Sequence, residues 1–389
     1  MRFEMRDPEV AQEPGPYYAT LREGCPVARV DDFGGFYILS TYADVSAAAR
    51  NPEVFSSADG ITIPKLPIPP QICLEQDEPE HGRYRRPMQQ WLSPGRMAKL
   101  EESVRKIVDT LIDGFVDAGE GDLAAELAEP VPPLVMALLM GLPDSDWHTF
   151  RDQMSRLVGY AAAEDPAAAQ AASQEFVGYL AGQLTDRAQN PRDDMMTDIA
   201  TLQIDGEPLS FEDQVSMAFL LLGAGHETTV GAIGGLLYYL ARDPALQEQL
   251  RANPALIPGA AEEAVRLVAP LPGMGRTVRE DITVRDTTLP EGSTVMLLYG
   301  SANRDPEEFD DPEEFKLGRD SNRHVGFGQG IHRCVGAPLA RLELKVVLEQ
   351  VVERLPGLEL TAPDAAVARY GTSRSYRSLN CRWTTPQSS

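Results

Sequence analysis

Apolar residues recur at helical spacing over most of the chain, and two stretches carry the pattern furthest. The first runs from Arg96 to Ala118 and is followed by a Gly-Glu-Gly turn. The second begins at Ser210, where Asp213, three residues later, completes an N-terminal capping pattern. It continues to Arg242 and should stop there, because the next residue precedes a proline and that position disfavours helix. Such a helix is on the order of 50 Å long, so we expect it to cross a whole domain.

Patterns typical of β-strands are short and occur in four stretches, at residues 26–30, 35–39, 277–298 and 358–383. Residues 31–34 predict a turn between the first two strands. The proline-rich run from Ile63 to Pro70 cannot sit inside a helix or a central strand, so it predicts a shaped loop. Residues 161–173 are rich in alanine, and we expect them to form a mobile link between two helices. The pattern as a whole predicts a single mainly α domain over residues 1–389, with small β-sheets at its edge.

Composition and charge narrow the classes of function. Of the 389 residues 43% are hydrophobic, which is enough for a substantial core. The formal net charge of −24 argues against a general nucleic-acid binder and against binding to an anionic membrane surface. No stretch reaches the ~18 consecutive apolar residues of a membrane span, and the N-terminus lacks the apolar core of a signal peptide. The four cysteines form no C-x-x-C pair, so we expect neither a disulfide framework nor a zinc site, and we predict a cytoplasmic location.

One cysteine, Cys334, lies in an unusual setting, the segment Phe327-Gly-Gln-Gly-Ile-His-Arg-Cys-Val-Gly336. Glycines let backbone amides turn toward the sulfur, and the helix predicted to open at Gly336-Ala-Pro338 adds partial positive charge. Both effects favour a thiolate, the soft anionic form in which cysteine serves as an axial ligand to iron. A buried structural cysteine is the more common role of a lone cysteine, but it leaves the three glycines unexplained.

The segment resembles the heme-ligand signature F-G-x-G-x-H-x-C-x-G of the cytochrome P450 superfamily. The similarity to the soluble bacterial, actinobacterial-type members extends over nearly the whole chain, because further motifs follow in the family's order. The resemblance implies the family's triangular, mostly α heme domain and a heme b (iron protoporphyrin IX) bound through the thiolate of Cys334. It also implies a monooxygenase that activates dioxygen to oxidise a small hydrophobic organic substrate.

On the predicted long helix, Gly223-Ala-Gly-His-Glu-Thr-Thr229 resembles the family's oxygen-activation motif A-G-x-[DE]-T. Glycine costs about 1 kcal/mol in a helix interior, so Gly223 and Gly225 together predict a local widening that admits dioxygen and water. The resemblance implies that Thr228 hydrogen-bonds dioxygen while Glu227 relays protons from solvent. A helix–helix contact with a surface glutamate is the alternative.

The segment Glu263-Ala-Val-Arg266 resembles the family's E-x-x-R motif. A spacing of three places both side chains on one face of a helix, where an ion pair forms easily. In the family this pair is completed by a downstream arginine, and Arg319 holds the matching position. The implied role is structural, as support for the loop that carries Cys334.

His81 and Arg85 resemble the family's H-x-x-x-R, and a spacing of four puts both on one helical face. Arg276 and His332 occupy the other usual positions for binding heme propionates. The cofactor-binding residues that the resemblance implies are His81, Arg85, Ala224, Gly225, Arg276, Phe327, His332, Cys334 and Gly336. The family's substrate-pocket positions are apolar or small here, which predicts a roomy hydrophobic pocket; they are Ile61, Leu220, Gly223, Ala224, Pro272, Met274 and Thr372.

We expect no fused reductase, so electrons should come from a ferredoxin and its reductase as transient partners of a monomer. Five basic residues are candidates for a docking face, although they are also typical of an ordinary solvated surface: Arg83, Arg86, Arg333, Arg341 and Lys345. Two other functions stay open. One is a peroxide-dependent or rearranging heme-thiolate enzyme, and the other is a non-catalytic heme sensor; the presence of Glu227 and Thr228 argues against both.

Overall fold

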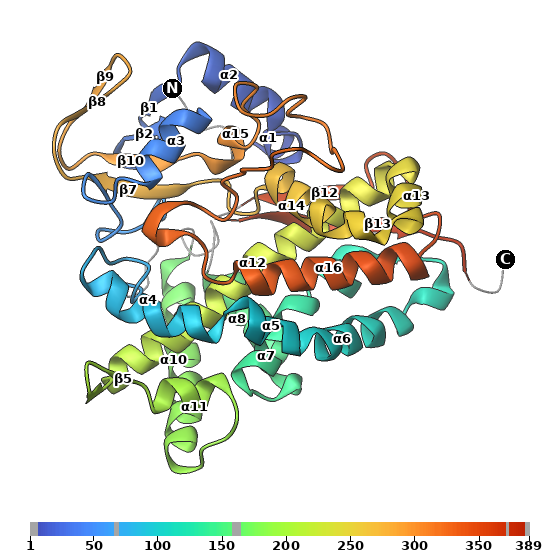
Figure 1. Ribbon diagram of the computed structural model, residues 1–389, viewed down its shortest axis with the longest axis horizontal. Coiled ribbons are helices and arrows are strands. Elements are labelled where there is room, and N and C mark those ends of the chain that lie inside the picture. Colours follow the sequence, from blue (N-terminus) through green and yellow to red (C-terminus); the bar gives the residue numbers. More distant parts are fainter. Residues whose placement is uncertain (1–6, 66–69, 158–164, 371–372, 386–389) are drawn as a thin grey trace.

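The computed structural model describes residues 7–65, 70–157, 165–370 and 373–385, and most of them are helical (Figure 1). The α-helices are α1 (Pro8–Gln12), α2 (Gly15–Gly24), α3 (Tyr42–Ala49), α4 (Glu80–Trp91), α5 (Pro94–Met97), α6 (Glu101–Asp113), α7 (Val131–Met140), α8 (Trp147–Leu157), α10 (Pro166–Gln189), α11 (Met195–Ala200), α12 (Phe211–Arg242), α13 (Pro244–Ala252), α14 (Ile257–Val268), α15 (Tyr299–Ala302) and α16 (Ala337–Arg354). Short helical turns are η2 (Asp32–Gly34), η3 (Ala98–Leu100), η4 (Val116–Ala118), η5 (Ala124–Ala128), η6 (Asp144–Asp146), η7 (Pro254–Leu256) and η8 (Gly330–His332).

The β-strands form small sheets, as the sequence predicted; in Figure 1 the largest lies at the upper left and β12 and β13 lie on the right. They are β1 (Val27–Val30), β2 (Phe36–Leu39), β3 (Phe55–Ser56), β4 (Glu120–Asp122), β5 (Gln203–Ile204), β6 (Glu207–Pro208), β7 (Met274–Val278), β8 (Ile282–Val284), β9 (Thr287–Leu289), β10 (Thr294–Leu297), β11 (Glu359–Leu360), β12 (Ala366–Tyr370) and β13 (Arg374–Arg382). The largest sheet has the order β1-β2-β10-β7-β3, and a second has β11-β13-β12 with β4 on β13. The antiparallel β1–β2 pair, with Val27 opposite Leu39, confirms the first predicted hairpin.

The predicted long helix is confirmed as α12. The hydroxyl of Ser210 accepts a hydrogen bond from the amide of Asp213 at 3.1 Å, and the helix ends at Arg242 as expected. All of its residues from Phe211 to Arg242 are α-helical, and the widening near the glycines stays a prediction. At Gly225 a Cβ would lie 2.6 Å from the sulfur of Met136, so the missing side chain leaves room for this residue of α7 against α12.

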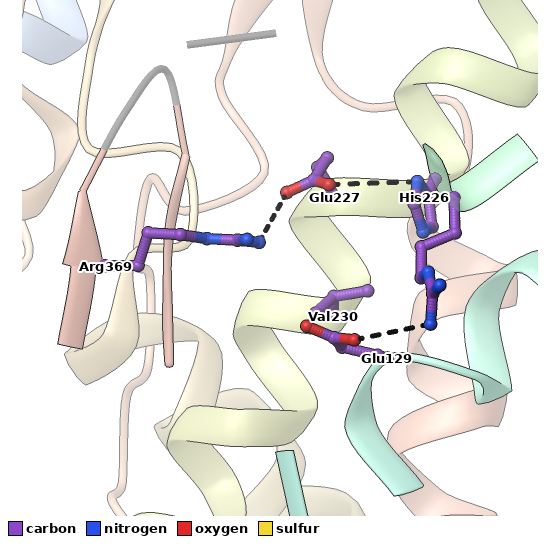
Figure 2. A pocket seen from close by; sticks show the side chains of 6 residues that line it. Glu129, His226, Glu227, Val230 and Arg369 are labelled. Carbon is purple, nitrogen blue, oxygen red and sulfur yellow. Dashed lines mark hydrogen bonds and ion pairs between the residues drawn. The ribbon is translucent and has the colours of Figure 1, made fainter. Parts of the chain in front are cut away.

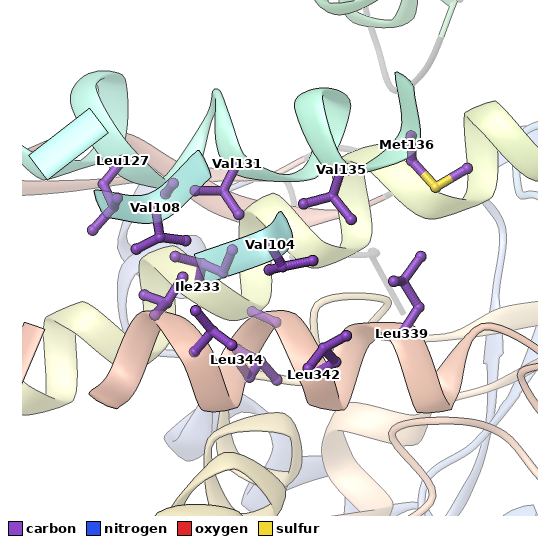
Figure 3. Packing of buried hydrophobic residues seen from close by; sticks show 14 of the residues in the cluster. Val104, Val108, Leu127, Val131, Val135, Met136, Ile233, Leu339, Leu342 and Leu344 are labelled. Atoms are coloured by element: carbon purple, nitrogen blue, oxygen red, sulfur yellow. The ribbon is translucent and has the colours of Figure 1, made fainter. Parts of the chain in front are cut away.

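Helix α12 lies at the centre of the core and packs against β13, α7, α14, α10 and α16. In Figure 3 the apolar side chains of α6, α7, α12 and α16 meet around it, with Ile233 of α12 facing Leu344 of α16 and Val131 of α7 nearby. The core therefore fixes α12 firmly against α16, the helix that follows the cysteine loop.

None of the helices in the described part of the chain is long and apolar enough to span a bilayer.

Two predictions need correction. The stretch 161–173 is not a link from end to end, because α10 already begins at Pro166, with Asp165 accepting a hydrogen bond from the amide of Ala168. Alanine is the strongest helix former, which explains the difference; residues 158–164 lie outside the described residues. The helix predicted over 96–118 is divided into α5, η3, α6 and η4, with Gly114 ending α6.

Candidate active site

Cys334 lies in the loop between η8 and α16, and glycines shape that loop. Gly328 and Gly330 have φ values of 66° and 68°, a region that side chains other than glycine rarely adopt. A Cβ on Gly330 would also clash with the backbone carbonyl of Ala49. The amide of Cys334 donates a hydrogen bond to the carbonyl of Phe327 at 2.7 Å, which closes the loop on itself. The side chain of Cys334 is exposed, so its sulfur is free to coordinate a metal ion.

Opposing effects act on the pKa of the Cys334 thiol. Although the residue is exposed, desolvation by the protein around the loop raises the pKa of its thiol, and this effect is the largest. The amides of Gly336 and Ala337 hydrogen-bond the sulfur and lower the pKa, as do Arg85 and Arg341 through their charge. The amides of the loop and of the helix N-terminus thus act in the predicted direction, toward a thiolate, against the larger effect of desolvation. A coordinating metal ion deprotonates a thiol outright, which removes that obstacle.

A buried ion network stands behind the cysteine loop. Glu263 and Arg266 of α14 are both fully buried and pair at 2.8 Å, and Arg319 reaches the same carboxylate at 2.8 Å. Arg266 also donates to the carbonyls of Asn303, Pro312 and Glu314. The structure therefore brings together the three residues that the motif predicted, and it ties α14 to the segment that leads into the cysteine loop.

A second group next to this network was not found from the sequence. Glu262 accepts two hydrogen bonds from Arg341 at 2.6 and 2.9 Å, and His324 lies 3.2 Å from the same carboxylate. Burial raises the pKa of Glu262, but Arg341 and His324 lower it more, to about 2. The guanidinium of Arg341 lies 4.7 Å from the centre of the Phe327 ring, which is a cation–π contact. Glu262 precedes Glu263 in the sequence, and only the fold reveals its partners.

The four predicted propionate ligands gather into a cluster of cationic and neutral nitrogen donors. The rings of His81 and His332 are 4.6 Å apart, and Arg276, which is 3% exposed, acts electrostatically on His332. Burial, Arg276, His81 and Arg85 lower the pKa of His332 to about 3. Among the described residues neither Nε2 of His81 nor Nε of Arg85 has a hydrogen-bond partner, and both atoms are buried.

A buried polar atom without a partner is costly, and the Nε–H of Arg85 can only donate, so this cluster suits an anionic group. Arg85 links it to the cysteine loop, because it donates to the carbonyl of Arg333 and lowers the pKa of Cys334. A soft sulfur ligand beside a set of carboxylate-binding nitrogens is the donor chemistry that heme requires. The residues present therefore fit an iron porphyrin with two propionates.

Thr228 and Glu227 are neighbours on α12 and leave it on different sides. The Thr228 hydroxyl donates to the carbonyl of Ala224 at 3.0 Å, and Ala224 is exposed on the same face. The Glu227 side chain is only 12% exposed, which excludes the alternative of a surface glutamate. Figure 2 shows it between His226 and Arg369, whose guanidinium lies 3.4 Å from the carboxylate. Burial raises the pKa of Glu227, while Arg369 and the hydroxyl of Ser373 lower it.

The residues predicted to line a substrate pocket come from α12 and from the region of β7. Leu220, Gly223 and Met274 are partly exposed, whereas Pro272 is buried. The carbonyl of Ile61 accepts a hydrogen bond from the amide of Gly275 at 2.7 Å, which joins the loop after β3 to β7. Thr372 lies outside the described residues. Pocket roles for these residues stay a prediction.

Known proteins share both the sequence and this arrangement. The family model described as "Cytochrome P450" matches residues 135–356, more than half of the chain. The chain belongs to the cytochrome P450 family. It is 36% identical to cytochrome P450 107B1 of Saccharopolyspora erythraea over 92% of each chain. It is 34% identical to the cytochrome P450 monooxygenase PikC of Streptomyces venezuelae over 96% of this chain and 92% of that one.

Among solved structures, the bacillaene polyketide synthase cytochrome P450 PksS of Bacillus subtilis superposes with a TM-score of 0.90 at 30% identity, over 97% of this chain and 98% of that one. The predicted mainly α P450 fold is therefore confirmed. The cofactor is heme, and the chain is a heme-thiolate cytochrome P450 monooxygenase.

The five basic residues predicted to form a docking face are not equivalent. Three form ion pairs: Arg83 with Asp205, Arg341 with Glu262, and Lys345 with Glu101. Arg86 and Arg333 are exposed, on α4 and next to Cys334 respectively. The charge available to a partner on this face is thus smaller than the sequence suggested.

Proposed function

We propose that this P450 takes electrons from a ferredoxin and its reductase and inserts one oxygen atom into a small hydrophobic organic molecule. In the balanced reaction the substrate, one dioxygen, two electrons and two protons give the hydroxylated product and one water. The observation that carries the proposal is the adjacency of Glu227, a buried carboxyl with a raised pKa, and Thr228, a hydroxyl on the more exposed face of α12. A non-catalytic heme protein has no need of a proton donor in that position.

Heme, when bound, supplies the iron that binds and reduces dioxygen. Cys334 is the residue that would hold the iron, and His81, Arg85, Arg276 and His332 would bind the propionates. Phe327 and Gly336 would shape the loop around the sulfur, and Ala224 and Gly225 would lie against the cofactor from α12. The unpartnered nitrogens of His81 and Arg85 support the propionate assignment.

Glu227 and Thr228 divide the handling of protons between them. The Thr228 hydroxyl already donates to Ala224, so its oxygen is left to accept a hydrogen bond from a water or from a protonated group. The raised pKa of Glu227 lets the carboxyl keep a proton closer to neutral pH than an exposed glutamate does, which suits a general acid. We infer that Glu227 supplies protons and that Thr228 directs them.

Support for the partners and the substrate is of different kinds. Arg86 and Arg333 supply positive charge beside the cysteine loop of a strongly acidic chain, and a small acidic ferredoxin would be attracted to it. Ile61, Leu220 and Met274 are apolar and partly exposed, which suits a hydrophobic substrate. All four cysteines are free, which supports the proposed reducing, cytoplasmic location.

The test begins with a substrate screen that measures the shift of the Soret band as water leaves the iron. With a bound substrate, turnover with reduced ferredoxin is compared with turnover driven by hydrogen peroxide. Thr228→Ala should keep heme and substrate binding while much of the consumed oxygen appears as hydrogen peroxide, and Thr228→Ser should restore coupling. Unchanged coupling in Thr228→Ala would overturn the role of the hydroxyl. Turnover with hydrogen peroxide but not with reduced ferredoxin would overturn the ferredoxin proposal.

A further inference from the structure

Ser57, the residue that follows β3, is completely buried and lies where two segments of the cofactor site meet. Its hydroxyl oxygen is 2.8 Å from Nε2 of His332 in η8. On the other side its amide donates to the carboxylate of Asp77 at 3.2 Å, and its hydroxyl lies 3.4 Å from the carbonyl of Gln76. The carbonyl of Asp77 accepts a hydrogen bond from the amide of His81 at 2.9 Å. One serine therefore joins the segments that carry the two histidines.

A third segment, β7, passes close to the same serine. β3 pairs antiparallel with β7, and Ser56 lies opposite Thr277. Continued by one residue, this register would set Ser57 opposite Arg276, which is 3% exposed. Strand pairing on one side and Asp77 on the other thus fix the backbone at Ser57. The serine is a rigid point among the segments that carry the predicted propionate ligands.

Two adjacent serines point in different directions here, because successive side chains of an extended chain alternate. Ser56 is also completely buried, and its hydroxyl donates to the carboxylate of Asp77 and accepts from Arg279 at 2.7 Å. Ser57 directs its hydroxyl to the ring of His332 instead. Ser56 therefore stabilises the local fold, whereas Ser57 acts on a residue of the cofactor site.

The contact occupies one of the two ring nitrogens of His332. Among the described residues no other group hydrogen-bonds this ring, so Nδ1 is the nitrogen left for the cofactor. A propionate carboxylate only accepts hydrogen bonds, so the nitrogen that binds it must carry a proton. The proton of an imidazole is placed by the hydrogen bond that the other nitrogen makes. A hydroxyl that donates to Nε2 therefore places the proton on Nδ1.

The Ser57 hydroxyl has one proton and two acceptors within reach. Nε2 of His332 is 2.8 Å away, whereas the carbonyl of Gln76 is 3.4 Å away. Hydrogen bonds from hydroxyl groups are usually about 2.5–3.0 Å long, so the longer contact is outside the ordinary range. The hydroxyl is thus expected to donate to the ring.

We propose that Ser57 is a positioning residue of the heme site, whose hydroxyl holds the His332 ring with the N–H of Nδ1 directed at a heme propionate. The inference rests on the proposed propionate role of His332 and adds the residue that orients it. Without the hydroxyl the ring is free to rotate or to carry its proton on Nε2, and the propionate then loses its donor for part of the time.

A purely structural serine is the alternative. The amide of Ser57 and the contact of its hydroxyl with Gln76 would then serve only to hold the loop against α4. In that case removal of the hydroxyl would lower the stability of the protein and leave the cofactor site unchanged. The two roles therefore differ in what happens at the ring of His332 and at the heme.

The first test measures the position of the ring proton in the wild-type holoenzyme. The reduced carbon monoxide complex is diamagnetic, so nitrogen NMR of the five isotope-labelled histidines distinguishes protonated from unprotonated ring nitrogens. The signals of His332 are those that are absent in His332→Gln. We expect the proton on Nδ1 and none on Nε2. A proton on Nε2 would overturn the inference, and this measurement needs no variant of Ser57.

The second test follows the transfer of heme from the ferric holoenzyme to a heme-scavenging protein in excess. Ser57→Ala should lose heme on the order of tenfold faster, the effect expected of one hydrogen bond to a charged group, and should show a mixture of His332 tautomers. Ser57→Thr keeps the hydroxyl and should restore the wild-type rate. Ser40→Ala is the control, because Ser40 is also completely buried but donates to the carbonyl of Pro26 at 3.1 Å; it should lose heme at the wild-type rate.

The outcomes separate this inference from the role on which it rests. If His332→Gln loses heme faster while Ser57→Ala matches the wild type in rate and tautomer, the serine is structural and this inference fails alone. If His332→Gln itself loses heme at the wild-type rate, the propionate role of His332 fails, and the positioning role of Ser57 with it. Equal acceleration in Ser57→Ala and Ser40→Ala would also count against the inference, because it would reflect a general loss of stability.

Discussion

Two sets of ionised residues flank the site, and they are built differently. Behind the loop of Cys334, Glu262 and Glu263 pair with three arginines at 2.6–2.8 Å, and Glu263 and Arg266 are fully buried. Behind Thr228, Glu227 lies 3.4 Å from Arg369 and 3.9 Å from His226, beside a cavity of about 210 Å³ that Glu129 and Arg151 also line. Short, saturated pairs fix a geometry, whereas groups separated by water can change partners. We therefore expect the first region to hold a ligand in place and the second to allow protons to move.

The largest expected effect comes from replacing Cys334, whose loop the first region supports. Cys334→His should abolish the red-shifted Soret band of the carbon monoxide complex and all monooxygenase turnover, because imidazole does not donate electron density as a thiolate does. The measurement is the carbon monoxide difference spectrum of the reduced protein. Persistence of that band would show that another residue holds the iron.

Glu263→Gln tests whether the short ion pairs behind Cys334 contribute more to the free energy of unfolding than the contacts of Glu227 do. Arg266 and Arg319 would be left with buried, uncompensated charge, which typically costs about 3–5 kcal/mol. Glu227→Gln should cost less than about 1 kcal/mol, because the partner Arg369 is partly exposed and 3.4 Å away. Urea unfolding of both variants measures the difference. Equal losses would mean that the contrast in distance has no energetic counterpart.

Most of the first region was predictable from the sequence, and most of the second was not. Glu263, Arg266 and Cys334 lie in short motifs whose spacing alone places them on one face or in one loop. The long helix was predicted with its cap because Ser210 and the proline after Asp243 are local signals. Local signals of this kind are read without knowledge of the fold.

The lining of the cavity depends on tertiary packing instead. Glu129, Arg151 and Arg369 are separated by tens to hundreds of residues and meet only because η5, α8 and β12 pack around α12. His226 lies inside the quoted motif, but at a position that the motif leaves variable. The close contact between Gly225 and the side chain of Met136 is a tertiary feature of the same kind, which the sequence pattern does not reveal.

Arg341 tests a single ion pair of the first region, the one behind the loop of Cys334. It pairs with Glu262 and lies over the ring of Phe327, close to Cys334. Arg341→Met should lower the heme reduction potential by removing a cation near the sulfur, and Glu262→Gln should raise it by removing an anion. Either change should also cost about 1 kcal/mol of stability, since the pair is partly exposed. Spectroelectrochemical titration measures the potentials.

Lys345→Met is the matched control, because Lys345 lies one turn along α16 and pairs with Glu101 instead. A shift of the same size in Lys345→Met would mean that only net charge matters and not the position of Arg341 at the loop.

Glu343 of α16 differs from Glu262 and Glu263, because its buried carboxyl is not paired with an arginine of the described residues. It lies on the helix that follows Cys334 and is only 1% exposed, yet neither carboxyl oxygen has a hydrogen-bond partner within the described part of the chain. Burial raises its pKa well above that of a free glutamate. In the unfolded chain the carboxyl ionises at its ordinary pKa of about 4.3. Stability is therefore lost as pH rises above that value, up to the pKa of the folded state.

Glu343→Gln removes this ionisation and should stabilise the protein increasingly between about pH 5 and pH 8. The difference from the wild type can grow by at most about 1.4 kcal/mol per pH unit, and it stops growing once the folded pKa is passed. Thermal unfolding at several pH values measures it, with Glu353→Gln, an exposed acid on the same helix, as the control. A difference that stays constant with pH would mean that Glu343 has a partner in the folded protein.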